Sequence, residues 1–174
     1  MTNAEKTNEE SGLPYRKCVA IFLLSKSKVF TGRRGDVSNA WQLPQGGIEE
    51  GEDSLTAAKR ELFEETNVLS VKPLVSSNSY RYDFPQYVQR NILKKHRQLK
   101  YKGQEIVFWV FEFTGNEEEI DVLKKPQEFL EWKWMSLENL LDSIVAFKKS
   151  SYFNAIKDFQ KFGIFEASRA VIRR

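Results

Sequence analysis

Apolar residues recur along the chain in short runs that predict strands, separated by polar turns. Cys18–Leu24 is continuously apolar and of strand length, which indicates a central strand buried on both faces. Ser25–Lys28 predicts a turn, and Val29–Thr31 the returning strand. Ile106–Phe113, rich in β-branched and aromatic residues, is the strongest strand signal. Leu69–Tyr82 alternates loosely and predicts one or two further strands.

A stricter alternation follows in Phe129–Met135. Leu130, Trp132 and Trp134 fall on one face of this segment, and charged residues fall on the other. This pattern is typical of a half-buried strand. The three glutamates that precede it, at 117–119, predict a solvated acidic loop.

Helical spacing appears near the C-terminal end of the sequence. Ser136 predicts an N-cap, and it precedes apolar residues at helical spacing, which are Leu137, Leu140, Leu141 and Ile144. A second helix is expected over about Ser151–Phe162, with Gly163 as its stop. Strands followed by helices, with one more helix in the middle, predict an α+β fold.

Length and composition favour one domain over residues 13–163, with a disordered tail at 1–12 and a frayed tail at 164–174. No apolar stretch reaches membrane-spanning length and no signal peptide is recognisable, so we expect a cytoplasmic protein without a membrane partner. Cys18, the single cysteine, excludes an intramolecular disulfide, and His96, the single histidine, excludes a multi-histidine zinc site. The sequence indicates no obligate protein partner.

Two basic segments each leave two interpretations open. Arg33 and Arg34 belong either to a solvated loop or to a phosphate clamp. Arg90–Lys102 contains many cations and no acidic residue. It is either an exposed loop or short helix, or a surface that overhangs a polyphosphate or RNA site. The net charge of +3 is too small to identify a nucleic-acid-binding protein.

The candidate chemistry lies in Trp41–Val68, where a Gly-rich loop leads into a helix that carries Glu61, Glu64 and Glu65. Positions i, i+3 and i+4 share one helix face, so these carboxylates converge beside an apolar stripe. Like charges at such a place repel one another and resist desolvation. A divalent cation relieves both costs, and carboxylate oxygens suit Mg²⁺ or Mn²⁺. The alternative is a solvated acidic helix face.

The same stretch resembles the Nudix box, G-x5-E-x7-R-E-U-x-E-E-x-G-U, in which U is a bulky aliphatic residue. The matching residues are Gly46, Glu52, Arg60-Glu61-Leu62, Glu64-Glu65 and Val68, and Asn67 replaces the last glycine. Asparagine tolerates the left-handed backbone expected there. The resemblance implies a Nudix fold, a mixed β-sheet sandwiched between α-helices, and metal-dependent cleavage of a nucleoside diphosphate linkage.

Within that family, the box implies specific roles. Arg60 is expected to pair with Glu52 and to fix the loop against the helix. A turn at Gly46 and Gly47 would let a backbone carbonyl approach the metal, because glycine has no Cβ in the way. Glu61, Glu64 and Glu65 would hold Mg²⁺, for which Mn²⁺ is a possible substitute, and one glutamate would accept the proton of the attacking water.

The flanking segments resemble the bacterial RNA pyrophosphohydrolase group, and they are Leu13–Arg16, Trp41–Gly47, Gly103-Gln104, Glu128-Phe129 and Phe147-Lys148. This resemblance implies removal of pyrophosphate from 5′-triphosphorylated RNA. It also implies that Glu128 joins the metal ligands, that Arg16 and Arg34 contact the 5′ phosphates, and that Phe147 stacks on a base with Lys148 near the backbone. From the residues alone, Glu128 reads as a surface glutamate and Phe147 as helix core.

Two alternative functions stay open. A dinucleoside polyphosphate hydrolase, acting on diadenosine tetra- or pentaphosphate, would use the same carboxylates. A non-catalytic Nudix domain that binds nucleotide or RNA as a regulator is less favoured, because every carboxylate of the box is retained. One departure from the group is Glu105, where a basic residue is usual.

Overall fold

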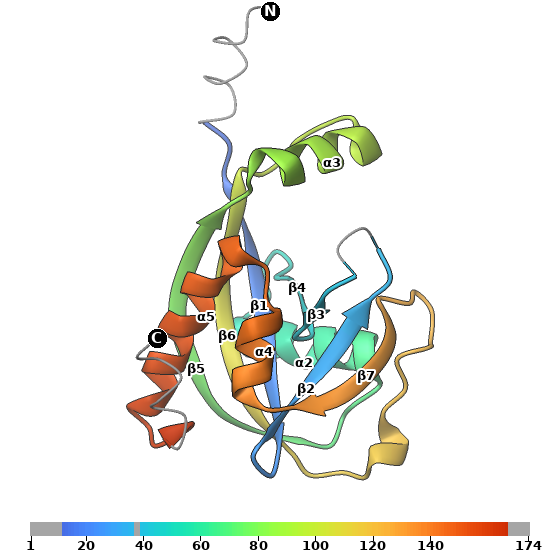
Figure 1. Cartoon of the computed structure of the whole chain (residues 1–174), viewed down its shortest axis with the longest axis vertical. Coiled ribbons are helices and arrows are strands. Elements are labelled where there is room, and N and C mark those ends of the chain that lie inside the picture. Colours follow the sequence, from blue (N-terminus) through green and yellow to red (C-terminus); the bar gives the residue numbers. More distant parts are fainter. Residues whose placement is uncertain (1–11, 37–38, 167–174) are drawn as a thin grey trace, which may run out of the picture.

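A curved seven-stranded mixed sheet fills the middle of the molecule, in a computed structural model that describes residues 12–36 and 39–166 (Figure 1). Its strands are β1 (Tyr15–Ser25), β2 (Lys28–Arg34), β3 (Trp41–Gln42), β4 (Gln45–Gly47), β5 (Val71–Asp83), β6 (Gly103–Phe113) and β7 (Phe129–Met135). The order is β3-β2-β1-β6-β5, with β4 paired to β1 and β7 paired to β2. Only β1 and β6 pair in parallel among these strands.

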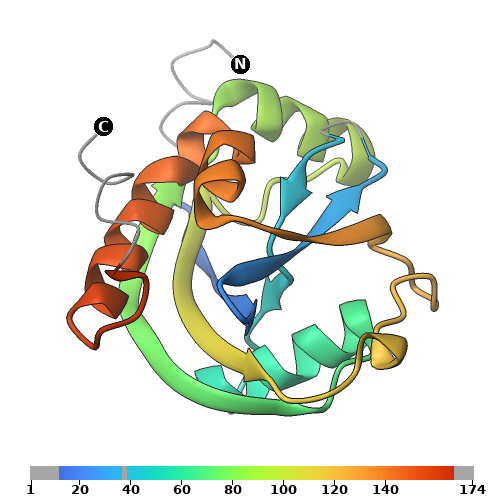
Figure 2. The ribbon, with the colours of Figure 1, turned by 60° about the horizontal axis from the view of Figure 1, so that its bottom comes forward.

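Helices cover both faces of this sheet. They are α2 (Ser54–Thr66), α3 (Gln86–His96), α4 (Leu137–Ser143) and α5 (Lys149–Gln160), with short 3-10 turns η1 (Glu117–Glu119) and η2 (Ala146–Lys148). Figure 2 shows α2 on one side of the sheet and α4 with α5 on the other. The predicted α+β sandwich is therefore confirmed. Among the described helices, none is long and apolar enough to cross a membrane.

The strand β1 explains why one apolar run lacks any alternation. Cys18, Ala20 and Phe22 pack into the core beneath α4 and α5, whereas Val19, Ile21 and Leu23 pack into the core beneath α2. Successive side chains of a strand point to opposite faces, so a strand between two cores must be apolar at every position. The predicted burial on both faces is confirmed.

The C-terminal helices follow their predicted spacing. Ser136 accepts a hydrogen bond from the Asn139 amide at 3.2 Å, as an N-cap does, and the predicted apolar positions of α4 are buried. In α5 the apolar face, Tyr152, Ile156 and Phe159, is also buried. Ile164 and Phe165 pack against the same core, beyond the domain end predicted at residue 163. Residues 1–11 and 167–174 of the predicted tails lie outside the described residues.

The prediction for β7 is wrong at one position. Leu130 is 48% exposed, whereas Trp132 and Trp134 pack against the core next to α2. The cause is a shift in register between β2 and β7 at Arg33 and Arg34. An irregularity of this kind inserts an extra residue and interrupts the alternation that the pattern assumed.

The acidic run at 117–119 is exposed at Glu117 and Glu118, as expected, but it is not an irregular loop. It forms η1, and the Glu119 carboxylate accepts the backbone amides of Leu69 at 2.7 Å and Ser70 at 2.9 Å. These two bonds lower the pKa of Glu119. The Glu117 carboxylate accepts the indole N–H of Trp134 at 2.7 Å. Two of the three charges thus tie separate segments together.

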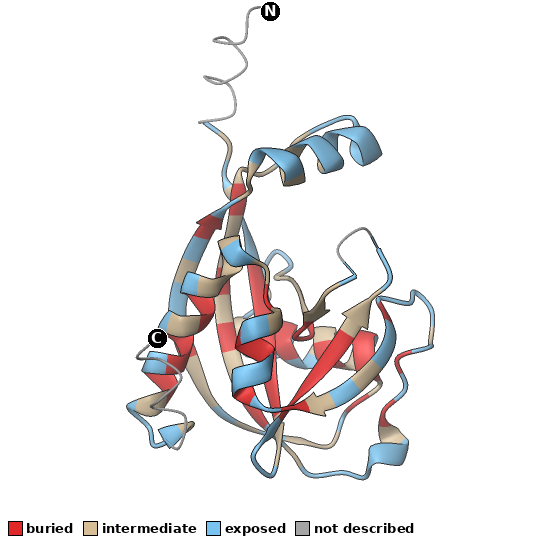
Figure 3. Cartoon of the chain, viewed as in Figure 1, coloured by how far each residue is buried: buried red, intermediate tan, exposed pale blue. Residues whose placement is uncertain are grey.

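The chain between β5 and β6 folds as α3. Leu69–Tyr82 forms the greater part of a single long strand, β5, and Pro85 occupies the N-cap position of α3. No residue of α3 is buried, and Figure 3 shows it projecting from the body with a mainly exposed surface. Of the two structural forms expected for the basic segment, the helix is confirmed.

Candidate active site: the acidic helix and its cations

The acidic helix α2 is held at both ends by side chains of its own sequence. Asp53 caps the start by accepting the amide of Thr56 at 2.8 Å. Asn67 ends the helix with φ at +65°, so the left-handed backbone predicted at this position is confirmed. Its side-chain amide also donates to the carbonyl of Glu119 at 3.1 Å, which fixes the end of α2 against η1.

The three carboxylates of α2 lie in different surroundings. Glu65 is only 8% exposed and accepts the backbone amide of Gln45 at 3.2 Å. Glu61 is half-buried, and the side chain of Glu64 is 52% exposed. Within ranges 12–36 and 39–166, no three acidic, histidine or cysteine side chains are grouped closely enough to hold a metal ion. The role of Glu61, Glu64 and Glu65 as shared metal ligands therefore stays a prediction.

Arg60 bridges two of these carboxylates. Its Nη1 lies 2.8 Å from Oε1 of Glu61 and 3.5 Å from Oε2 of Glu64. A guanidinium here compensates part of the negative charge that a metal would otherwise neutralise. The sequence analysis expected Arg60 to pair with Glu52, and it did not reveal that the head of Arg60 also reaches Glu61 and Glu64.

The predicted pair between Arg60 and Glu52 is present in bidentate form. Nε of Arg60 lies 2.8 Å from Oε1 of Glu52, and Nη2 lies 2.8 Å from Oε2. Nη2 also donates to the carbonyl of Gly47 at 2.9 Å. These bonds lower the pKa of Glu52 to about 2. Arg60 thus connects the loop, β4 and α2.

Gly46 and Gly47 lie in strand β4 rather than in the expected turn, because both pair with β1. Their lack of a side chain matters for a close approach. A Cβ at Gly46 would lie 2.0 Å from Cδ of Glu61, and a Cβ at Gly47 would lie 2.7 Å from Nη2 of Arg16. Glycine at these two positions therefore leaves room for a carboxylate and a guanidinium that flank β4.

We expect Gly46→Ala to lower kcat roughly 100-fold, because the added methyl must displace the Glu61 carboxylate by an ångström or more. Turnover and thermal unfolding would be measured together. Gly51→Ala is the matched control, since a Cβ at Gly51 meets no atom within 4 Å and the strain arises only from its φ of +77°. That control should lose about 1 kcal/mol of stability and keep its turnover. Equal rates in Gly46→Ala and the wild type would contradict this assignment.

The surroundings of Glu61 and Glu65 disfavour the charged form of both carboxylates. Burial raises the pKa of Glu65 well above its usual range, and the charges of Glu128 and Glu61 raise it further. Burial also raises the pKa of Glu61. Beside them, Oε1 of Gln45 is buried without a hydrogen-bond partner among the described residues. Carboxylate oxygens that repel one another, together with the unpaired amide oxygen of Gln45, fit a hard divalent cation.

Cations surround this acidic centre. The charge of Arg34 lowers the pKa of Glu65, which places the guanidinium near the carboxylate, although Arg34 is also paired with Asp36. Burial lowers the pKa of Lys148 to about 8, and the charge of Arg34 contributes to this shift. Arg16 lines an open hollow of about 700 Å³ together with Glu61. The structure thus brings Arg16 and Arg34 to the carboxylates and Lys148 to the vicinity of Arg34.

The two arginines at the end of β2 have different surroundings. Arg33 donates to Glu131 at 2.7 Å and to Asn39 at 2.7 Å, so its head is held away from the acidic centre. Arg34 alone acts on the acidic centre. Of the two interpretations left open by the sequence, the solvated loop therefore applies to Arg33 and the phosphate clamp to Arg34. Of these two arginines, only Arg34 is a candidate for phosphate contact.

Phe147 is half-buried and stands among tyrosines that the sequence analysis missed. Its ring centre lies 5.6 Å from that of Tyr82 and 6.3 Å from that of Tyr87, both edge-on. Tyr82 is buried, and Tyr87 is 53% exposed. The two tyrosines lie on either side of Asp83-Phe84-Pro85, where the strand pattern ends at a proline. Aromatic residues at such a point, next to a basic segment, are the signal that could have identified them.

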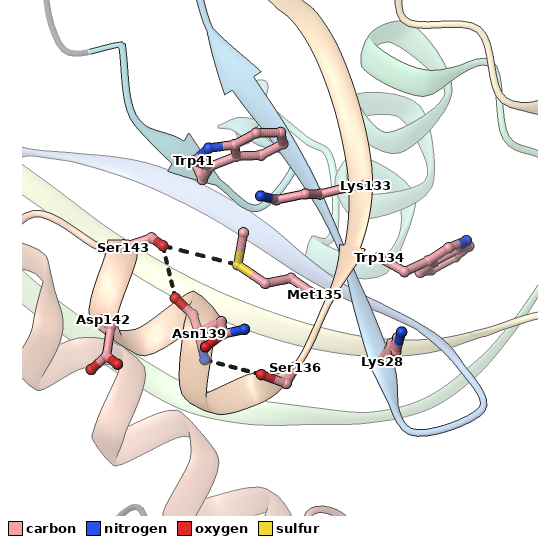
Figure 4. A pocket seen from close by; sticks show the side chains of 9 residues that line it. All are labelled: Lys28, Trp41, Lys133, Trp134, Met135, Ser136, Asn139, Asp142 and Ser143. Atoms are coloured by element: carbon pink, nitrogen blue, oxygen red, sulfur yellow. Dashed lines mark hydrogen bonds between the residues drawn. The ribbon is translucent and has the colours of Figure 1, made fainter.

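A second hollow, of about 620 Å³, lies between β7 and α4 and carries none of the motif glutamates (Figure 4). Trp41 lines it, with the ammonium of Lys133 4.1 Å from its ring centre. Ser136 and Ser143 also line it, and both make the local helix hydrogen bonds drawn in the figure. Trp41 begins the acidic stretch in sequence but faces this other hollow.

Comparisons with known proteins agree with this geometry. The NUDIX domain model matches residues 14–155. An RNA pyrophosphohydrolase of Bartonella clarridgeiae is 42% identical over 162 residues, covering 85% of this chain and 91% of that protein. One of Dinoroseobacter shibae is 43% identical over 157 residues, covering 86% and 96%. The chloroplastic Nudix hydrolase 27 of Arabidopsis thaliana is 40% identical over 172 residues, covering 95% and 75%.

Solved structures share the fold at lower identity. An Ap4A hydrolase of C. elegans in a binary complex aligns with a TM-score of 0.59 at 19% identity, covering 84% of this chain and 96% of that one. The dihydroneopterin triphosphate pyrophosphohydrolase of E. coli aligns with a TM-score of 0.59 at 16% identity, covering 79% and 93%. With the domain match, the motif and this fold in agreement, the chain belongs to the Nudix family.

Proposed function

We propose that this chain hydrolyses the 5′-triphosphate end of RNA, releasing pyrophosphate and leaving a 5′-monophosphate. The observation that carries the proposal is the presence of Arg16 and Arg34 beside an acidic centre that suits a divalent metal, with Lys148 near Arg34. The relatives named RNA pyrophosphohydrolase, about 40% identical over most of both chains, support it. Removal of the terminal pyrophosphate would expose such RNA to decay.

The divalent cation would be Mg²⁺, for which Mn²⁺ could substitute. It would be held by four carboxylates and one backbone carbonyl, which are those of Glu61, Glu64, Glu65, Glu128 and Gly46. Such a cation neutralises phosphate charge and lowers the pKa of water near phosphorus. Arg60 contacts Oε1 of Glu61 at 2.8 Å, so the other oxygen of this carboxylate would be available to the metal. The bidentate bond between Arg60 and Glu52 would hold the loop in place when the metal is bound.

The substrate contacts follow from the charges around the centre. The guanidinium forks of Arg16 and Arg34 are suited to bidentate contacts with the 5′ phosphates. Phe147 would stack on a base, which tolerates any base identity, while Lys148 lies near the backbone. One of Glu61, Glu64 and Glu65 accepts the proton of the attacking water. Phosphates would compete with Asp36 for Arg34.

The departure at Glu105 does not disturb this arrangement. Its carboxylate accepts Nε of Arg81 at 2.6 Å, which lowers the pKa of Glu105 and neutralises its charge within the sheet. Glu105 therefore places no unpaired negative charge beside the substrate. A cytoplasmic location suits an RNA substrate and stays a prediction.

The test is a competition at equal concentrations of 5′-triphosphate RNA and diadenosine tetraphosphate, with Mg²⁺ and, separately, with EDTA. We expect pyrophosphate and 5′-monophosphate RNA to form with the higher kcat/KM, and EDTA to stop the reaction. Exclusive cleavage of the dinucleotide would establish the alternative hydrolase. Binding of RNA without cleavage of either substrate would establish a regulator.

A further inference from the structure

Helix α3 carries a charge pattern that the catalytic centre does not use. Gln86–Lys102 contains the cations Arg90, Lys94, Lys95, Arg97, Lys100 and Lys102, and no acidic residue. Over the part of the chain that the structure describes, none of these six cations forms an ion pair. Cations in the last turn stabilise the helix dipole, which accounts for Lys94 and Lys95. It does not account for Arg90, which lies in the middle of α3.

One face of α3 combines these cations with an aromatic ring. Tyr87, Arg90 and Lys94 are separated by three and four residues, so they lie on the same side of the helix. Val88 and Ile92, which are partly buried, belong to the opposite side. Arg90 and Lys94 are like charges at i and i+4, a spacing that destabilises an isolated helix. A polyanion bound along this face would remove that repulsion.

The face is continuous with the proposed RNA site. Tyr87 contacts Phe147 edge-on at 6.3 Å, so the exposed tyrosine is next to the ring proposed to stack on a base. Phe147 belongs to η2, which directly precedes α5, and Figure 2 draws the start of α5 next to α3. Lys94 lies about 10 Å further along the helix from Tyr87. Aromatic rings followed by a row of cations are the usual surface for single-stranded nucleic acid.

We propose that Tyr87, Arg90 and Lys94 form a second RNA-binding surface, which holds the single strand downstream of the nucleotides at the catalytic centre. This inference rests on the proposed function and adds a substrate preference to it. Short substrates end before they reach Arg90 and Lys94, whereas longer strands contact them. The surface therefore makes turnover increase with RNA length, and it separates RNA from free dinucleotides.

The experiment measures kcat/KM for 5′-triphosphate RNAs of two lengths, a dinucleotide and a single strand of about twelve nucleotides. The wild type should prefer the longer strand. In the double variant Arg90→Gln/Lys94→Gln, the rate for the long strand should fall about tenfold while the dinucleotide rate is unchanged. The slope of log kcat/KM against log salt for the long strand should become shallower by about 1.4, since each lost phosphate contact contributes about 0.7.

The matched control is Lys72→Gln/Lys157→Gln, which removes the same charge from exposed positions on β5 and α5. It should leave the length preference unchanged, whereas Tyr87→Ala should lower the long-strand rate about tenfold through lost stacking. If both RNAs are turned over and Arg90→Gln/Lys94→Gln has no effect on either rate, this inference is overturned and the proposed function is not. Equal loss in the control would also overturn it, because net charge would then explain the effect. Absence of turnover on any RNA would overturn the proposed function as well.

Discussion

Replacing Glu65 with glutamine is expected to abolish turnover and, without metal, to raise the melting temperature. The carboxylate is buried, and burial raises its pKa well above 4.5, so the charged form destabilises the folded state. Glutamine has the same shape and no charge. A raised pKa in the folded state means that stability is greatest below 4.5 and is lost as pH rises through the folded pKa. The difference in melting temperature between Glu65→Gln and the wild type should therefore increase as pH rises above 4.5.

The measurements are kcat with Mg²⁺ and thermal unfolding in EDTA at acidic and mildly basic pH. A loss of roughly 10²- to 10⁴-fold in kcat is expected, and Mg²⁺ should stabilise the wild type more than the variant. Glu64→Gln should lose turnover without the gain in stability, because its side chain is 52% exposed. Glu50→Gln, an exposed glutamate of the preceding loop, is the control and should behave as wild type. An active Glu65→Gln enzyme would contradict the assignment.

Arg60→Ala should both destabilise the protein and inactivate it. The change removes the bidentate bond to Glu52 and the contact with Glu61, and it leaves both carboxylates without their cation. A loss of about 1–3 kcal/mol in unfolding free energy is expected for a partly exposed charged network. Activity should fall roughly 100-fold, since the loop and β4 lose their common anchor. Urea unfolding and kcat report the two effects separately.

The pH dependence of stability tests whether the bond between Arg60 and Glu52 causes the loss in Arg60→Ala. Arg60 lowers the pKa of Glu52 to about 2, so the pair stabilises the fold above the ordinary value of 4.5 and is lost as pH falls toward 2. The difference in stability between wild type and Arg60→Ala should therefore narrow between pH 5 and pH 2. Arg60→Lys should recover little, because an ammonium cannot make the bidentate bond. A constant difference across this range would mean that lost packing explains the effect.

Much of the fold follows from local pattern. The continuous apolar run of β1 and the helical spacing of α4 and α5 each encode burial directly, and the structure agrees with them. The left-handed cap at Asn67 follows from the chemistry of asparagine at a helix end. The pairing of Arg60 with Glu52 came from the resemblance to a family, because no local rule joins a loop residue to a helix eight positions later.

Two of the errors arise from contacts between distant segments, and the third arises from the reach of a long side chain within one helix. Leu130 is exposed because β7 slips relative to β2, and only the partner strand reveals that slip. Glu119 binds amides of residues about fifty positions earlier in the chain. The head of Arg60 lies between two glutamates because its long side chain can reach across the helix face. Sequence spacing predicts where the Cα atoms of a helix lie. It does not predict where the end of a long side chain lies, because that depends on the surrounding side chains.

The position of α3 between β5 and β6 has a consequence for how this enzyme can change. The two strands already meet in the ladder at Asp83 and Gly103, and the amide of Phe84 donates to the carbonyl of Lys102 at 2.8 Å. The connecting segment therefore begins and ends at one point, and altering its length costs little closure entropy. Since α3 buries no residue, its replacement leaves both cores intact. Changes in this segment can therefore alter the proposed contacts with RNA and leave the motif residues of α2 in place.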